Sequence, residues 1–143
     1  MKDYSNLTHE ECLEFVKNDG YEIRHLTAEQ RTPEVCLAAV ENYGESIKYL
    51  REKQRTQEVC LAAVKESGLA IRFVSNKKRT PDIYLSAVKK DSYSILHLTG
   101  AQRTPEVCLA AVKNDVTLIK CLTPAQKQSI EGMYKSANIE MRR

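Results

Sequence analysis

The sequence of 143 residues lacks tryptophan and contains only two phenylalanines, so seven tyrosines supply most of its aromatic surface. No stretch approaches the roughly 18 consecutive apolar residues that a membrane-spanning helix needs. The first six residues lack the apolar core of a signal peptide. From these absences we expect a cytoplasmic protein without a membrane partner.

Sequence motifs for catalysis and metal binding are also missing. The five cysteines are odd in number and include no CxxC pair, which argues against a disulfide framework and against a zinc site. There is no glycine-rich phosphate loop and no recognisable carboxylate pair or Ser-His-Asp arrangement. The net charge of +3 is too small to indicate a polyanionic partner. We therefore expect a protein that is not an enzyme and needs no cofactor or metal.

What the sequence does contain is an internal repeat of 24 residues. The ten-residue segment 31–40 returns at residues 55–64, 79–88 and 103–112, and a diverged copy occupies residues 8–16. The repeats have no insertions and define five units, at residues 8–31, 32–55, 56–79, 80–103 and 104–127. Such strict spacing predicts that each unit stacks on the one before it, within a single domain of residues 1–143.

Each unit begins with the signals of an α-helix. A threonine can serve as the N-cap. Proline, which has no backbone N–H, is well tolerated in the first turn, because an N–H group at that position would have no partner in the helix. We expect this helix to end in a left-handed C-cap at Gly20, Gly44 and Gly68. Ser92 and Val116 replace the glycine in the last two units, which predicts a different helix end there.

A second, shorter helix is expected in each unit, with a buried isoleucine and a buried leucine or valine three residues later. A closing Thr-x-x-Gln pattern, as in residues 27–30, predicts one further turn. Helices this short cannot bury their apolar faces alone, so neighbouring units must stabilise each other. The expected fold is all-α: an α-solenoid of five 24-residue two-helix repeats with a C-terminal cap at residues 128–143, including a helix from Ser129 to Ala137.

The repeated pattern resembles a known family. It consists of the core TPEVCLAAVK, as at residues 104–113, an Ile-x-x-Leu helix, as at residues 23–26, and a closing Gln-Arg-Thr, as at residues 30–32. Over residues 8–127 it resembles the short bacterial repeat known as domain of unknown function 4116. The resemblance implies a bacterial helical repeat array and no enzymatic activity that could be carried over to this chain.

Two residue types recur at fixed positions of the units. One series is cysteine, at positions 12, 36, 60 and 108, and the other is arginine, at positions 31, 55, 79 and 103. We interpret the cysteines as core residues, because helices stacked about 8–10 Å apart exceed the Cα separation of roughly 7 Å that a disulfide tolerates. For the arginines we favour contacts with carbonyl groups at helix ends, or with nearby acids, over a phosphate-binding stripe.

Binding specificity should lie where the units differ, and two neighbouring positions of the second helix vary. One holds His25, Tyr49, Phe73, His97 and Cys121, and the position before it holds Arg24, Lys48, Arg72, Leu96 and Lys120. The candidate partner-binding residues are therefore Arg24, His25, Lys48, Tyr49, Arg72, Phe73, His97 and Lys120. Rings beside arginine are typical of interface hot spots. The rings could instead cover the groove between helices, with cationic side chains laid over them. Both interpretations stay open.

Together these features predict a non-catalytic protein-binding helical-repeat scaffold. The most concrete hypothesis is a bacterial immunity protein that binds and neutralises a toxin, by analogy with small stand-alone inhibitors. One alternative is an effector or adaptor module that recruits a host or regulatory protein. Another is a single-stranded nucleic-acid binder that stacks bases on the same rings, an alternative weakened by the small net charge.

Overall fold

The computed structural model describes residues 3–136, and within this range the protein is built from helices without any β-strand. The α-helices are α1 (His9–Asn18), α2 (Pro33–Asn42), α3 (Gln57–Glu66), α4 (Pro81–Lys90), α5 (Pro105–Asn114) and α6 (Pro124–Ser136). Between them lie 3-10 helices, labelled η: η1 (Gly20–His25), η2 (Gly44–Tyr49), η3 (Glu52–Gln54), η4 (Gly68–Phe73), η5 (Asn76–Lys78), η6 (Ser92–His97) and η7 (Val116–Cys121). The predicted all-α class is confirmed.

The first five α-helices begin at threonine N-caps, as predicted. In each of them the hydroxyl oxygen accepts a hydrogen bond from the backbone N–H three residues later: Thr8, Thr32, Thr56, Thr80 and Thr104. In α1 the cap is reciprocal, because the Glu11 carboxylate accepts from the backbone N–H of Thr8 at 3.0 Å. Each of these helices then runs for ten residues, so that equal lengths lie side by side.

The left-handed C-caps predicted at Gly20, Gly44 and Gly68 are wrong. Each helix ends two residues before the glycine, and the C-cap residue between them is extended, such as Tyr43 with φ −143° and ψ 98°. The glycine instead leaves room for the next unit. A Cβ added to Gly44 would lie only 2.4 Å from the carbonyl oxygen of Ala63 in that unit, which is too close. Glycine is therefore needed for the close approach of two units and not for a turn of the backbone.

The different helix ends predicted at Ser92 and Val116 are wrong for the same reason. The residues that end α4 and α5, Asp91 and Asp115, are extended like those that end the earlier helices. Because the glycine does not terminate the helix, its replacement leaves the helix end unchanged.

The second helix of each unit is a six-residue 3-10 helix, which is tighter than an α-helix. Its buried residues follow the predicted pattern in the first four units: Ile23 and Leu26, Ile47 and Leu50, Ile71 and Val74, and Ile95 and Leu98. In the fifth unit Leu118 and Leu122 are buried and Ile119 is only partly buried. These side chains and the buried faces of the α-helices form one hydrophobic core.

The closing Thr-x-x-Gln pattern predicts a helical turn, and residues 27–30 form a hydrogen-bonded turn that is not helical. At Thr27 the backbone N–H donates to Oε1 of Gln30 at 2.9 Å, and the N–H of Gln30 donates to Oγ1 of Thr27 at 3.2 Å. Two reciprocal hydrogen bonds therefore hold the four residues in a tight turn.

The same pattern at Thr123 opens the C-terminal helix earlier than predicted. The N–H of Thr123 donates to Oε1 of Gln126 at 2.9 Å, and α6 begins at Pro124, five residues before the predicted start at Ser129. The predicted end at Ala137 lies outside the described residues. Ile130 of α6 is fully buried, so this helix covers the core beside α5.

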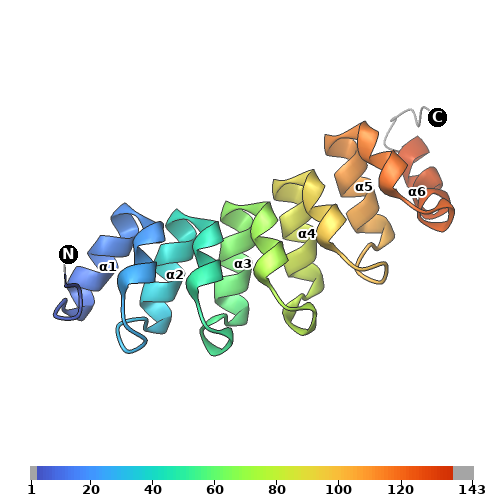
Figure 1. Ribbon diagram of the computed structural model, residues 1–143. Coiled ribbons are helices and arrows are strands. Elements are labelled where there is room, and N and C mark those ends of the chain that lie inside the picture. Colours follow the sequence, from blue (N-terminus) through green and yellow to red (C-terminus); the bar gives the residue numbers. More distant parts are fainter. Residues whose placement is uncertain (1–2, 137–143) are drawn as a thin grey trace.

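The α-helices stand side by side in chain order, and the 3-10 helices form a second layer along them (Figure 1). Each α-helix contacts the next, and successive six-residue 3-10 helices contact each other in the same way. The outward side of α1 to α5 is called the α face below, and the outward side of the six-residue 3-10 helices is called the η face. The contact between two consecutive units is called a junction.

An arginine fastens each unit to the next. Nη1 of this arginine donates to a backbone carbonyl at the end of the following 3-10 helix: Arg31 to Tyr49 at 2.6 Å, Arg55 to Phe73 at 2.6 Å, Arg79 to His97 at 2.7 Å and Arg103 to Cys121 at 3.1 Å. The predicted contact between the arginines and carbonyl groups is thus confirmed. The Nη1 partner belongs to the next unit, whereas Nε of Arg55 and of Arg79 also donates to a carbonyl of its own unit, that of Leu50 at 3.1 Å and that of Val74 at 2.9 Å. The arginines hold the stack together.

The fourth junction, between the fourth and fifth units, is looser than the others. Its arginine bond is the longest of the four. Asn42 donates to the carbonyl of Lys17 at 3.0 Å across the first junction, whereas Asn114 donates to the carbonyl of Lys89 at 3.4 Å across the fourth. In Figure 1 the row of α-helices is nearly level from α1 to α3 and rises from α3 through α4 to α5.

Candidate protein-binding surfaces

The predicted partner-binding residues all lie on the η face, within η1, η2, η4, η6 and η7. The cations cover rings of their own 3-10 helix: Nζ of Lys48 lies 5.3 Å from the ring centroid of Tyr49, and Cζ of Arg72 lies 4.8 Å from that of Phe73. Arg24 does not pair with His25. Its guanidinium lies 4.2 Å from the ring of Tyr21, which is one turn earlier on the same side of η1.

The rings of this set differ in burial. Tyr49 and Phe73 are half-buried and pack on the core. His25 and His97 are exposed, but the ring of His25 stacks on Tyr4 at 5.0 Å between centroids. The arrangement supports the covering interpretation at Tyr49 and Phe73, while a binding role for these residues stays a prediction.

The basic column of the η face is interrupted and partly paired. Arg72 forms an ion pair with Glu45 of the preceding unit, and Leu96 stands exposed where the other units have a cation. Beside it Tyr93 is half exposed, and a hydrogen bond with the Asp115 carboxylate raises the pKa of the tyrosine. Lys120 is exposed at the end of the column. These interruptions leave no continuous cationic stripe on the described part of this face.

Two tyrosines join the first two units on the η face. The rings of Tyr21 and Tyr49 meet edge to face at 5.4 Å between centroids. The hydrogen bond between their hydroxyls raises the pKa of Tyr49. The variable ring of the second unit therefore takes part in a junction, which adds a structural role to the predicted binding role.

The cysteine series lies in the core, as predicted. Cys12, Cys36, Cys60 and Cys108 are buried and unpaired, and Tyr84 fills the same position of the fourth unit. Burial raises the pKa of the Cys36 thiol to about 11, which keeps it in the unreactive neutral form. Cys121, on η7, is exposed. Within residues 3–136, His, Cys, Asp and Glu side chains form no cluster of three that could hold a metal ion.

The α face carries a second surface, which the sequence interpretation did not include. In each of α1 to α5, four residues spaced i, i+3, i+4 and i+7 lie on one side of the helix. The first is an acid, the second a leucine and the fourth a charged residue. The third is small in four of the five helices. The leucines are Leu13, Leu37, Leu61, Leu85 and Leu109, and all are only partly buried. The small neighbours are Ala38, Ala62, Ser86 and Ala110. An apolar strip therefore crosses the α-helices.

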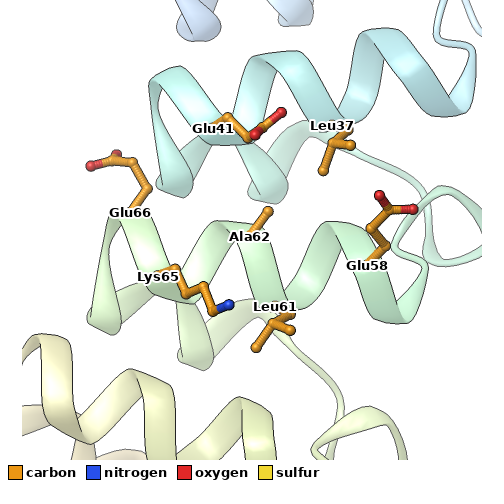
Figure 2. Close-up of a pocket in the computed structure, with 7 residues that line it drawn as sticks. All are labelled: Leu37, Glu41, Glu58, Leu61, Ala62, Lys65 and Glu66. Carbon is orange, nitrogen blue, oxygen red and sulfur yellow. The ribbon is translucent and has the colours of Figure 1, made fainter.

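The strip is hollowed between neighbouring helices. An open hollow of about 450 Å³ lies between α2 and α3, where Leu37 and Glu41 face Ala62 (Figure 2). A second, of about 410 Å³, lies between α4 and α5 and is lined by Leu109 and Ala110 among others. Both hollows have apolar floors and charged rims.

The repeated sequence held a signal for this surface. Residues Val35, Cys36, Ala39 and Val40 of α2 are buried, and Leu37 lies at the border of that face. A leucine kept in every unit at the border of the buried face indicates either packing or binding. Helical periodicity alone does not separate the two, because a leucine at that angle contacts both the core and the solvent.

Comparison with known proteins places part of the chain in a family. In the described part of the chain, none of the helices combines the length and the hydrophobicity that a membrane crossing requires. No curated protein matches the sequence, and no solved structure matches it. Residues 32–77 match the family described as domain of unknown function (DUF4116), so the resemblance read from the repeats is confirmed over the second unit and most of the third.

Proposed function

We propose that this protein is a five-unit α-solenoid that binds another protein along its α face and does not act as a catalyst. The observation that carries the proposal is the apolar strip of partly exposed leucines, hollowed between α2 and α3 and between α4 and α5. A strip that continues from unit to unit suits a long segment of a partner that contacts several units, because repeat arrays bind along their length.

The strip would gain free energy from being covered. Completing the burial of a leucine that is already partly buried contributes a fraction of the roughly 1.5–3 kcal/mol for a full side chain. Five leucines in one line, with small residues beside them that allow close approach, give the dry centre that a protein interface needs. The η face supports the proposal less well, because Tyr49 and Phe73 already contact the core. Lys48 and Arg72 already contact rings, and Arg72 also contacts an acid.

The more specific proposal is that the partner is a toxin, which the protein neutralises as an immunity partner. Binding without catalysis is sufficient for that role. An effector or adaptor would use the same surface on a host or regulatory protein. Co-expression with the captured partner separates these roles: survival of cells that otherwise die from the partner supports immunity.

The test is capture from a lysate of the source cell with immobilised protein, after nuclease treatment. We expect the wild-type protein to retain a protein partner at physiological salt, and the double variant Leu37→Lys and Leu61→Lys to lose it. The matched control is Lys48→Ala with Arg72→Ala on the η face, which should retain it. Circular dichroism and urea unfolding check that all three proteins are folded.

Two results would contradict the proposal. One is retention of nucleic acid alone, with a steep dependence on salt, which would favour the nucleic-acid alternative. The other is equal retention of the partner by the wild type and the α-face variant, which would place binding on the η face or at an end of the array.

A further inference from the structure

We infer that the segment bound on the α face is one amphipathic α-helix that lies across α1 to α5, with basic residues along one edge and acidic residues along the other. This inference rests on the proposed function and names the chemistry of the partner. It follows from the two rims of the apolar strip, from the width between them and from the spacing of the units.

The rim near the N-terminal ends of the α-helices is acidic. Its residues are exposed in every unit: Glu10, Glu34, Glu58, Asp82 and Glu106. Among the described side chains, this rim has one close contact with a basic residue: Nε2 of His9 lies 3.5 Å from Oε2 of Glu34. The acidic rim therefore offers almost all of its charge to a partner.

The rim near the C-terminal ends is mainly basic. It consists of Lys17, Glu41, Lys65, Lys89 and Lys113, all exposed. None of these side chains takes part in an ion pair within the part of the chain that the structure describes. A partner that complements both rims needs positive charge on one side of its apolar stripe and negative charge on the other.

The distance between the rims matches the width of a helix. Glu58 and Lys65 are seven residues apart in α3, which corresponds to about 10.5 Å along the helix axis at 1.5 Å per residue. An α-helix with its side chains is about 10–12 Å across. A helix that rests on Leu61 and Ala62 therefore brings its two edges over the two rims.

The spacing of the units matches the repeat of such a helix. Neighbouring helices pack about 8–10 Å apart, and one heptad of an α-helix rises about 10.5 Å. One group of apolar residues in each heptad can then enter the hollow between two α-helices. An extended strand fits the spacing as well, but its side chains alternate between two faces and do not form two lateral charged edges.

The rim charges also stabilise their own helices, because acids lie near the positive end of each helix dipole and lysines near the negative end. A loss of binding after charge reversal could therefore follow from weakened folding. Rescue by a partner with the opposite charge removes this ambiguity, since a folding defect does not depend on the charge of the peptide.

The first step of the experiment locates the bound segment. Benzoylphenylalanine in place of Ala62, which lines the hollow on α3 (Figure 2), is irradiated in the complex with the captured partner. The matched control carries the same group in place of Phe73 on the η face. We expect a crosslink from position 62, and we expect mass spectrometry to identify a segment with an apolar residue every three to four positions flanked by opposite charges.

The second step tests the charges with a synthetic peptide of that segment, by fluorescence anisotropy. Lys65→Glu with Lys89→Glu should weaken binding about tenfold, since each exposed pair contributes a few fold. A peptide whose acidic edge is changed to lysine should recover most of this loss on the same variant. Glu41→Lys, which completes the lysine rim, should strengthen binding of the original peptide by about threefold.

The outcomes separate this inference from the proposed function. Capture of a partner that crosslinks from position 73 and not from position 62 overturns both the inference and the proposed use of the α face, while protein binding itself stands. A crosslink from position 62 to a segment without the helical pattern leaves the proposed function intact and overturns the inference. Loss of peptide binding without rescue by the charge-changed peptide also overturns it.

Discussion

The first three junctions and the fourth share their helices, caps and arginines, and they differ at the residue that opens the 3-10 helix. In the first three this residue is glycine, and a Cβ there would lie 2.2–2.4 Å from a carbonyl oxygen of the next unit. In the fourth it is Ser92, which has a Cβ. The bonds across that junction are longer. The side chain of Ser92 therefore accompanies the looser of the two kinds of junction.

Two of the three glycine junctions also have a hydrogen bond that the serine junction lacks among the described residues. The N–H of Gly20 donates to Oδ1 of Asn42 at 2.7 Å, and the N–H of Gly44 donates to Oε1 of Glu66 at 2.6 Å. Asn114, which occupies the position of Asn42 in the fifth unit, keeps only its longer bond to Lys89. At the third junction Gly68 approaches Ala87 as closely, but Lys90 takes the place of Asn42 and Glu66 and offers no acceptor, so the second polar contact needs both the glycine and an acceptor side chain.

The largest effect should come from adding the missing atom to a tight junction. We expect Gly44→Ala to lower the free energy of unfolding by about 3 kcal/mol, because the new Cβ would force the second and third units apart. Urea unfolding followed by circular dichroism measures this. The control is Gly100→Ala, where nothing lies within 4 Å of the added Cβ. Equal stability of the two variants would show that the close approach is not needed.

The next effect concerns the arginines. Arg55→Met removes the bond of 2.6 Å to the carbonyl of Phe73 together with bonds to the carbonyls of Leu50 and Lys48 in its own unit, and we expect a loss of about 2 kcal/mol. Arg103→Met removes a bond of 3.1 Å to the carbonyl of Cys121 and one of 3.2 Å to that of Ile95, and should cost about half as much. Thermal and urea unfolding of both variants give the comparison. A larger loss at Arg103 would mean that the fourth junction is as tight as the second.

A smaller effect separates two buried serines. Oγ of Ser46 donates to the carbonyl of Tyr43 at 2.6 Å, whereas Oγ of Ser94 is buried without a hydrogen-bond partner among the described residues. Ala70 occupies the same position of the third unit. We therefore expect Ser94→Ala to raise the free energy of unfolding by about 1 kcal/mol and Ser46→Ala to lower it by a similar amount. A loss of stability in both variants would indicate a partner for Ser94.

The smallest effect concerns the backbone N–H group that opens each 3-10 helix, and hydrogen exchange measured by NMR detects it. We expect the N–H of Gly44, bonded to Glu66, to exchange more slowly than the N–H of Ser92. In Ser92→Gly the fifth unit can move closer, and Asn114 can accept from the N–H at position 92 as Asn42 does from Gly20. Slower exchange at position 92 in this variant would support the comparison. Unchanged exchange would show that Ser92 does not hold the junction open.

Much of the fold follows from local chemistry and was predictable from the sequence. Threonine caps, the cysteine series and the buried isoleucines depend on residue type and helical spacing, which are visible in the sequence. The meaning of Gly44 was not predictable, because the atom that excludes a Cβ there belongs to Ala63, in the next unit. The same holds for the bond between Arg55 and the carbonyl of Phe73, which is 18 residues away.

The binding surfaces show the same limit. The sequence located the varying residues of the η face, but the contacts of Lys48 and Arg72 with rings depend on how each 3-10 helix turns. The leucines of the α face, such as Leu37 and Leu61, were not among the predicted binding residues, because a leucine that recurs in every unit has the same helical spacing whether it packs in the core or binds a partner. Only their partial exposure separates them from Val35 and Val59, which are buried.

The glycine that opens the 3-10 helix has a consequence for building new arrays from these units. Copies of the second or third unit, joined end to end, would repeat the close junctions of α1 to α4, because each copy brings the glycine that lets the next one approach. A copy of the fourth unit would introduce a looser junction wherever it is inserted. The choice between glycine and serine at one position would then set how tightly a designed scaffold is joined, unit by unit.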